Sequence, residues 1–404
     1  MKKRLNYFIT LSGLLLAVCG CSTTPGESTG KETTSGITTS KPTSEVTTVT
    51  PTTTVTPDTS KPEPFSTSLP TSSTSSDHKA TLDDFTTTEK LESFRERGYQ
   101  PLFTDMNFKN GFRITKTATD AEGGPYHSEY YHYYEETKTK TPSWTFCQWG
   151  SKYDIYQNFD LASSSDGFEY TLSSKGGKTI DGNFVPAKKA TFNTKTGSTY
   201  LECNTEVEYD TPRQNGQPWT HVLLEQDFSD NLIHVTELES LVMEAQFEVQ
   251  KFEDKMGNAF NPNLHAAQVV WYITIQNRNQ QSADYGKYIW FGVGLWDNRN
   301  AGKTTSLYAQ LDGGTSSFIY NPSSMYYYAD NGGKVPTAHQ KMTASMEVMK
   351  VVKSAYNLAI QRGFLGTTQF DDLYVGGMNF GFEVPGTYNI GVQFDDIGVY
   401  YKYK

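Results

Sequence analysis

The chain has 404 residues with 35 Lys and Arg against 45 Asp and Glu, a net charge of -10 at pH 7. This balance offers no surplus of cations for phosphates, so nucleic acid is excluded as an expected partner. A mean hydropathy of -0.58 excludes a polytopic membrane protein. Aromatic residues make up 14% of the chain; we expect some of them to be surface stacking groups rather than core.

Residues 1–20 predict a signal peptide, with Lys2, Lys3 and Arg4 before an apolar run at 11–18 that is too short to span a bilayer. The string Leu-Ala-Val-Cys-Gly-Cys-Ser at 16–22 resembles the lipobox of bacterial lipoproteins, in which a small residue precedes the lipidated cysteine. Gly20 makes Cys21 the better match. The resemblance implies a palmitate-type lipid anchor at Cys21, which would hold the protein on the extracellular face of the cell membrane. The alternative is a plain secretory signal.

Residues 21–78 predict a disordered stalk. Thr, Ser and Pro dominate this segment, and Phe65 is its single aromatic residue. Such a composition buries too little apolar surface to offset the entropy of ordering. We expect a spacer that lifts a domain away from the membrane, and the Thr/Ser/Pro tract also suits O-glycosylation.

Residues 79–404 predict one all-β domain, an antiparallel two-sheet sandwich with one helix packed on it. A short helical pattern begins near residue 82. Strand-like runs follow at 153–161, 168–173, 199–209, 220–228, 241–251, 267–276, 287–296, 306–311, 373–384 and 388–401. Residues 344–362 carry apolar side chains at helical spacing, and Gly363 stands where a C-terminal cap is expected. This many strands in one domain favours two stacked sheets.

Three strands indicate which side chains face solvent, because successive residues of a strand point to opposite faces. In 241–250 the polar row contains Glu244, Gln246 and Glu248; in 268–276 it contains Gln268, Tyr272 and Gln276. In 288–296 the outer row is Tyr288, Trp290, Gly292, Gly294 and Trp296. Aromatic rings around a glycine floor predict a trough in which a sugar ring stacks while neighbouring Gln and Glu bind its hydroxyls. The alternative is that loops or the 344–362 helix cover these rings.

The export signal, the stalk and the aromatic sandwich together resemble exported proteins with a concanavalin A-like jelly-roll domain, which include lectins, laminarinase-type glycosidases and polysaccharide lyases. The laminarinase signature is Glu-x-Asp-x-Glu, and the comparable string here is Glu244-Ala245-Gln246-Phe247-Glu248. The resemblance implies Glu244 as nucleophile and Glu248 as acid/base, although Gln246 replaces the central Asp. Their Cα atoms would lie about 13 Å apart, so a plain hydrogen-bonding row is the alternative.

Other groups of candidate functional residues give a weaker signal. His221, Glu225 and Asp227 share one side of a strand and could supply a lyase-like base, with Arg278 or Arg299 to neutralise a uronate; a structural histidine is the alternative. No cofactor and no protein metal site is expected, although the oxygen-rich turns at 297–300, 312–314 and 330–333 could hold a structural calcium ion. Cys147 and Cys203 could pair as a disulfide in an exported chain or remain two buried thiols.

The sequence thus favours a membrane-anchored surface lipoprotein that binds polysaccharide through Trp290 and Trp296. The alternative is a glycoside hydrolase using Glu244 and Glu248, or a polysaccharide lyase, on the same fold. A surface protein that binds another protein forms a third class. The oligomeric state is not indicated by the sequence.

Overall fold

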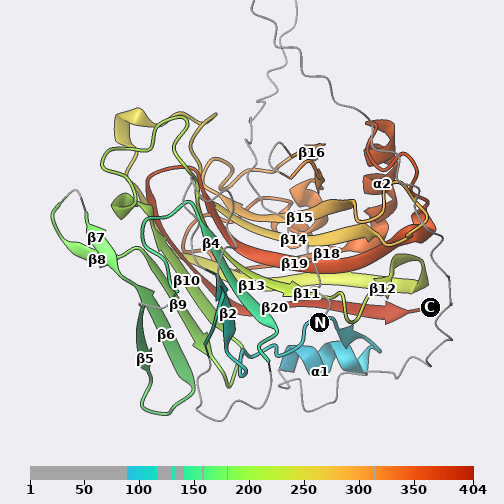
Figure 1. Ribbon diagram of the computed structural model, residues 1–404, viewed down its shortest axis with the longest axis horizontal. Coiled ribbons are helices and arrows are strands. Elements are labelled where there is room, and N and C mark those ends of the chain that lie inside the picture. Colours follow the sequence, from blue (N-terminus) through green and yellow to red (C-terminus); the bar gives the residue numbers. More distant parts are fainter. Residues whose placement is uncertain (1–88, 116–128, 133–140, 157–158, 180, 313–314) are drawn as a thin grey trace, which may run out of the picture. The chain divides into compact units, whose positions relative to one another are not determined.

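The computed structural model describes residues 89–404 except 116–128, 133–140, 157–158, 180 and 313–314 (Figure 1). The predicted signal peptide, Cys21 and the predicted stalk therefore lie outside the described residues. Among the residues that are described, no helix combines the length and apolar character needed to cross a membrane.

The described residues form two large sheets and one small hairpin sheet (Figure 1). Sheet A has the order β18 (Met342–Glu347), β13 (Leu238–Asp254), β20 (Tyr388–Tyr403), β10 (Thr199–Asn204), β9 (Lys188–Asn193), β6 (Glu169–Ser174) and β5 (Phe159–Ser163), with β1 (Gln100–Pro101) paired to β20. Sheet B has the order β16 (Tyr308–Leu311), β17 (Phe318–Asn321), β15 (Tyr288–Asp297), β14 (Gln268–Asn277), β19 (Leu373–Val384), β11 (Thr220–Asp227), β4 (Trp144–Trp149), β2 (Phe112–Thr115) and β3 (Glu129–His132), with β12 (Ile233–His234) paired to β19. The hairpin sheet consists of β7 (Gly176–Lys178) and β8 (Phe184–Pro186).

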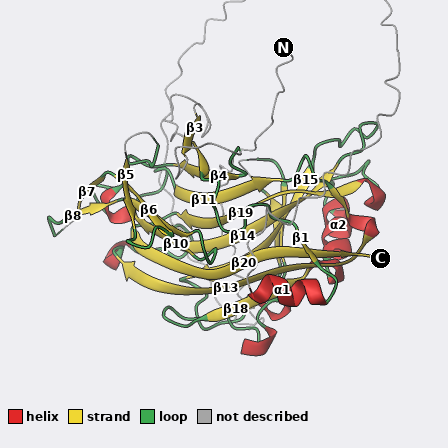
Figure 2. Ribbon diagram, turned by 90° about the horizontal axis from the view of Figure 1, so that it is seen from below, coloured by secondary structure: helices red, strands yellow, loops and turns green. Residues whose placement is uncertain are grey.

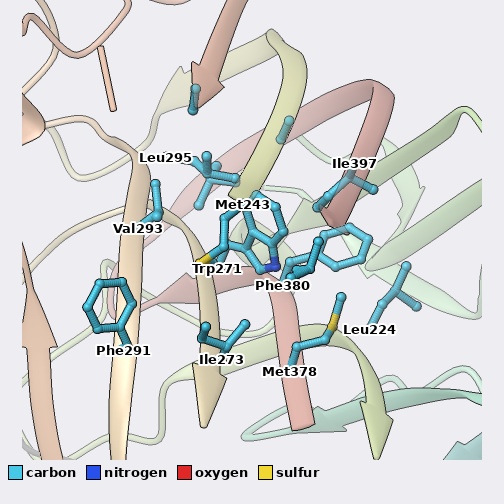
Figure 3. Close-up of a cluster of buried hydrophobic side chains, with 14 of the residues drawn as sticks. Leu224, Met243, Trp271, Ile273, Phe291, Val293, Leu295, Met378, Phe380 and Ile397 are labelled. Atoms are coloured by element: carbon cyan, nitrogen blue, oxygen red, sulfur yellow. The ribbon is translucent and has the colours of Figure 1, made fainter. Parts of the chain in front are cut away.

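The two large sheets stack face to face and bend in the same direction, with sheet B on the inside of the curve (Figure 2). Alternate side chains of each strand enter the layer between them, as period-two patterning requires. Met243 of β13, Trp271 of β14 and Phe380 of β19 meet in this layer (Figure 3), and none is more than 1% exposed. The predicted all-β, two-sheet sandwich is confirmed. Two strand pairs, β15 with β17 and β2 with β4, are parallel, so the sheets are not wholly antiparallel.

In the described part of the chain, two α-helices accompany the sheets. The helix α1 (Glu89–Glu96) anchors to sheet A through Phe94, whose ring stacks on Tyr400 with centroids 3.9 Å apart. The helix α2 (Val352–Gln361) packs against β15, and Gly363 follows it with a positive φ of 80°. Short 3-10 turns connect other elements: η3 (Thr205–Val207), η4 (Val235–Glu237), η5 (Gly257–Ala259), η6 (Ser324–Tyr326), η7 (Ala329–Asn331), η8 (Val348–Lys350) and η9 (Phe370–Asp372).

Two predicted elements need correction. The helix predicted over 344–362 begins only at Val352, because β18 occupies 342–347 with Ala344 and Met346 buried at strand spacing. The strand predicted over 153–161 is wrong in its first half. There the side chain of Gln148 accepts a hydrogen bond from the Ile155 amide and donates to the Ile155 carbonyl, which holds the segment in an irregular conformation.

Of the two alternatives for Cys147 and Cys203, the structure favours the second, without a disulfide. Both side chains are buried thiols, Cys147 on β4 of sheet B and Cys203 on β10 of sheet A. Burial raises the pKa of Cys203 to about 12, which keeps the thiol protonated and chemically inert.

Candidate functional site

The candidate site is the outer face of sheet B, on the inside of its curve (Figure 2). The strand register places outward-facing side chains in rows that cross the sheet. One row runs from Tyr272 on β14 to Asn379 on β19, Glu225 on β11 and Thr145 on β4. Each row thus collects side chains from segments far apart in the sequence.

Trp296 does not belong to this face. The register between β14 and β15 shifts so that Val269 pairs with Trp296 while Val270 pairs with Gly294. The extra residue, Leu295, makes a β-bulge that reverses the alternation beyond it. Trp296 therefore points into the sandwich, where it is 2% exposed and packs against Phe252 with ring centroids 5.0 Å apart. The prediction that Trp296 forms part of a sugar-binding row is wrong.

Tyr272, Tyr288 and Trp290 lie on the outer face, and both tyrosine rings contact Trp290 edge-on. The Trp290 ring is 5.9 Å from Tyr272 and 5.1 Å from Tyr288, measured between centroids. A Cβ at Gly292 would come within 2.1 Å of the Tyr272 ring, so the absence of a side chain at 292 makes room for this ring. Trp290 is nevertheless 7% exposed, since Ile319 of β17 packs against this cluster. Tyr272 and Tyr288 are likewise only 7% and 4% exposed. The prediction of an open aromatic trough is therefore wrong, and the covered alternative holds, with a strand rather than the predicted helix contributing the cover.

A cavity of about 770 Å³ opens beside these rings. Aromatic, acidic, amide and basic side chains share its wall. Glycines also line it, and they add no side chain that would fill the space. The wall includes Trp290, Tyr288, Tyr285, Phe364, Glu225, Asp227, Asn379, Gln276, Thr274, Arg278, Lys287, Gly376 and Gly377. Along one row Trp290 is followed by Thr274, Gly377 and Asp227 on successive strands. A flat ligand with both apolar and hydroxyl-bearing surfaces fits this combination of groups.

The remaining sequence-predicted residues are divided between the two sheets. Gln268 lies on the outer face of sheet B and donates a 3.1 Å hydrogen bond to Asp297. Glu244, Gln246 and Glu248 lie on β13 of sheet A. The outer faces of the two sheets point in opposite directions, so these three residues do not share a surface with Trp290. The hypothesis of a Glu244/Glu248 pair beside the aromatic row is therefore wrong in its geometry, and the Glu244 carboxylate accepts instead from Ser345 at 2.6 Å.

His221, Glu225 and Asp227 share the outer face of sheet B, as the sequence predicts, but His221 is unsuited to act as a base. Its ring lies between Trp149 and Trp219, at 4.4 and 6.2 Å between centroids, and its Nδ1 donates to the Trp219 carbonyl. Burial lowers the pKa of His221 to about 3. The imidazole is then neutral and only weakly basic, which favours the structural alternative.

Of the two arginines suggested as uronate partners, Arg299 is held by Asp297, whereas Arg278 lies in the cavity wall. Arg299 donates to both carboxylate oxygens of Asp297, at 2.9 and 2.5 Å, and Arg278 donates to Gln276. These contacts give no support to a lyase site.

Glu383 was missed by the sequence analysis. It lies on β19, in register with Gln268 on one side and His221 on the other, and is 3% exposed. Burial, followed by the nearby charge of Asp312, raises the pKa of Glu383 to about 8. The alternation of Asn379, Gly381 and Glu383 against the apolar residues between them could have assigned this carboxyl to the outer face.

Several buried polar atoms on this face have no hydrogen-bond partner among the described residues. They are the donor atoms Trp149 Nε1 and Trp290 Nε1, the hydroxyls Tyr288 OH and Tyr308 OH, and the oxygens Asn321 Oδ1, Asn379 Oδ1 and Glu383 Oε1. Buried polar groups in native proteins are almost always paired, so such a concentration indicates bound water or a ligand that supplies the missing bonds. Donors and acceptors are both present among them, as a hydroxyl-bearing ligand or bound water would require.

The raised pKa of Glu383 predicts a pH-dependent stability. The folded protein holds this proton up to about pH 8, whereas the unfolded chain releases it near 4.5. Between these values the unfolded state binds fewer protons, so the free energy of unfolding should fall as pH rises, by at most about 1.4 kcal/mol per pH unit. Urea denaturation from pH 4 to 9 measures it. Glu383→Gln should flatten the profile; an unchanged slope in this variant would contradict the assignment.

Among the described residues no three His, Cys, Asp or Glu side chains are grouped as metal ligands. In the turns singled out for calcium, Asp297 binds Arg299, and Asp312 accepts from the amide and hydroxyl of Thr315. These two carboxylates are thus already engaged by protein donors.

Comparisons with known proteins give fold resemblances alone. No family model and no curated protein matches the chain. Among solved structures, endoglucanase cel12A from Rhodothermus marinus is similar, with 11% identity over 61% of this chain and 97% of that one, at a TM-score of 0.33. A family 12 xyloglucanase from Bacillus licheniformis has 11% identity over 60% and 97%, also at 0.33. A loop-swap mutant of Necallimastix patriciarum Xyn11A has 9% identity over 61% and 96%, at 0.29.

Family 12 glycoside hydrolases have a jelly-roll fold of the concanavalin A-like type, the type that the sequence predicts here. Identities and TM-scores this low do not indicate what this chain binds or catalyses.

Proposed function

We propose that this chain binds a polysaccharide in the cavity on the outer face of sheet B. The observation that supports the proposal most is the convergence of Trp290 and Tyr288 with Glu225, Asp227 and Asn379 in one cavity. Sugar rings present an apolar C–H face for stacking and hydroxyls for hydrogen bonding, and they need both kinds of partner.

The charges on this face favour a neutral glycan. Glu225 and Asp227 line the cavity, and carboxylates accept hydrogen bonds from sugar hydroxyls but repel uronate or sulfate groups. The wall also contains two cations. Lys287 is paired with Asp284 at 2.6 Å, and Arg278 donates to the neutral amide of Gln276, so Glu225 and Asp227 still leave the wall with a net negative charge.

Affinity electrophoresis of the mature chain tests the proposal. Gels would contain soluble neutral glycans such as mixed-linkage β-glucan, xyloglucan and galactomannan, or the anionic glycans alginate and pectin. We expect retardation in at least one neutral glycan and in neither anionic one. Unretarded migration in every gel would overturn the proposal and favour a surface that binds another protein.

The lipid anchor at Cys21 and the spacer at 21–78 remain part of the proposal. They would hold the polysaccharide-binding domain at the extracellular face of the cell membrane. Partition of the exported protein into the detergent phase of a phase-separating detergent tests the anchor, and recovery in the aqueous phase would contradict it.

A glycoside hydrolase is the second candidate, and Glu383 is the observation that favours it. A general acid must be protonated at the working pH, and the pKa of about 8 satisfies this requirement. Asp297 and Glu383 both align with Gln268, so about two strand spacings, roughly 9–10 Å, separate their Cα atoms. The carboxyl groups of an inverting pair lie about 6.5–9.5 Å apart, so the two side chains would act as such a pair only if their carboxyl groups kept about the same spacing as the backbone. The glycan would have to extend from the cavity at Asn379 along β19 to Glu383.

Release of reducing ends from a retarding glycan tests this candidate. If the chain is a hydrolase that uses Glu383, Glu383→Gln should reduce the rate at least about 100-fold while retardation persists. Equal rates in the variant would exclude Glu383 as the acid. Absence of release from the wild-type protein would leave binding as the function.

A further inference from the structure

Two loops form the rim of the cavity. One comprises residues 278–287 between β14 and β15, and the other comprises 362–369 after α2. The first contributes Tyr285 and Lys287 to the cavity wall, and the second contributes Phe364. Tyr285 is 47% exposed whereas Trp290 is 7% exposed, so the Tyr285 ring is accessible at the mouth and the indole lies at the floor.

Asp284, the neighbour of Tyr285, ties the two loops together. It is 5% exposed and accepts from Lys287 Nζ at 2.6 Å, from the Thr367 amide at 2.6 Å and from the Thr367 hydroxyl at 2.8 Å. Burial disfavours the charged carboxylate, but the hydrogen bonds from Lys287 and Thr367 outweigh it and lower the pKa of Asp284 to about 2. The link is therefore intact at neutral pH.

Further hydrogen bonds reinforce the same junction. Asn277 Nδ2 donates to Ser282 at 3.0 Å and to Thr368 at 2.7 Å, and the Ser282 and Thr367 hydroxyls are 3.0 Å apart. Loops of this length usually lose entropy when they close on a ligand. Here the side chains that fix the rim are already paired, and the Tyr285 amide donates to the Ser282 carbonyl at 3.0 Å, so the backbone that carries the Tyr285 ring is held before any ligand arrives.

We propose that Tyr285 is an outer stacking platform for the glycan and that Asp284 is the positioning residue that holds it. The proposal rests on the proposed function, since it extends the same binding site from the floor to the rim. On this proposal, an oligosaccharide confined to the floor beside Trp290 would leave Tyr285 uncontacted. A longer one contacts both, so Tyr285 should set a preference for chain length.

Titration calorimetry of the mature chain with trimers and hexamers tests the proposal, using cello- and laminari-oligosaccharides as probes. Tyr285→Ala should weaken hexamer binding about tenfold and change trimer binding less than about twofold. Tyr285→Phe, the matched control, keeps the ring and should bind both lengths as the wild type does.

The Asp284 variants separate positioning from folding. Asp284→Asn replaces the carboxylate by an amide, which accepts fewer hydrogen bonds. This variant should lower hexamer affinity severalfold and leave trimer affinity unchanged. Thr367→Val is a milder change and should lower hexamer affinity to a smaller extent. A general loss of stability would weaken both lengths alike, and that result would overturn the positioning role.

The remaining outcomes separate the two proposals. Unchanged hexamer binding in Tyr285→Ala, with binding lost in Trp290→Ala, would overturn the platform alone. Failure of the wild type to bind any of these probes would overturn the platform, and the electrophoresis panel would then decide the proposed function separately.

Discussion

Trp290→Ala should abolish the retardation of this protein in any polysaccharide gel that retards the wild type. The substitution removes the largest ring in the cavity wall, together with its edge-on contacts to Tyr272 and Tyr288. Loss of a principal stacking surface should weaken binding about 100-fold or more. Affinity electrophoresis, followed by calorimetry with the retarding glycan, measures the change.

The controls separate binding from stability, because removing a buried indole also costs about 3–5 kcal/mol of folding free energy. Trp290→Phe keeps a ring in place and should retain part of the affinity. Trp296→Phe is the matched core change: its indole nitrogen has no hydrogen-bond partner among the described residues, so the variant loses packing alone. It should unfold more easily yet bind normally. Full retardation of folded Trp290→Ala would contradict the site.

The sandwich could be predicted because long strands carry an unambiguous alternation. On β13 the residues Leu241, Met243 and Phe247 are all buried, while Glu244 and Glu248 between them are partly exposed. This alternation, here called parity, is a property of each strand by itself, so one sequence is enough to reveal it. The start of the C-terminal helix was less clear, because residues 342–347 fit a strand as well as a helix.

Trp296 shows where parity fails. The bulge at Leu295 reverses the alternation, and it arises from how β15 pairs with β14 rather than from a pattern within β15. Tyr288 and Trp290 precede the bulge and lie where the alternation assigns them.

Parity also cannot tell which sheet a strand joins. Glu244 and Trp290 both point away from the core, but β13 pairs with β18 and β20 while β15 pairs with β14 and β17. These long-range pairings put the two residues on opposite outer faces. The pairings of β19 with β11 and β14 likewise bring Glu383 beside His221 and Gln268, a juxtaposition that no local motif indicates. The fold class was therefore accessible from the sequence, whereas the composition of the site depended on strand order.

Lys188→Met should lower the free energy of unfolding by about 3–5 kcal/mol. Lys188 lies on β9 of sheet A, whereas the proposed site lies on sheet B. The Lys188 side chain is fully buried and lies 3.6 Å from the carboxylate of Glu208, which is equally inaccessible. Its ammonium also donates to the Tyr153 carbonyl at 2.5 Å and to the Ser151 hydroxyl. Removing it leaves the Glu208 charge buried without its counter-ion, and that desolvation is the main expected cost.

A double-mutant cycle tests this cause, with urea denaturation as the measurement. Glu208→Gln in the Lys188→Met background removes the stranded charge, while an amide can still accept from the Lys152 amide, which now donates to Glu208 at 2.6 Å. The double variant should therefore be more stable than Lys188→Met. Lys152→Met breaks the exposed pair with Asp210 and should cost at most about 1 kcal/mol. Additive losses in the double variant would show that lost packing around Lys188, rather than the uncompensated charge, sets the cost.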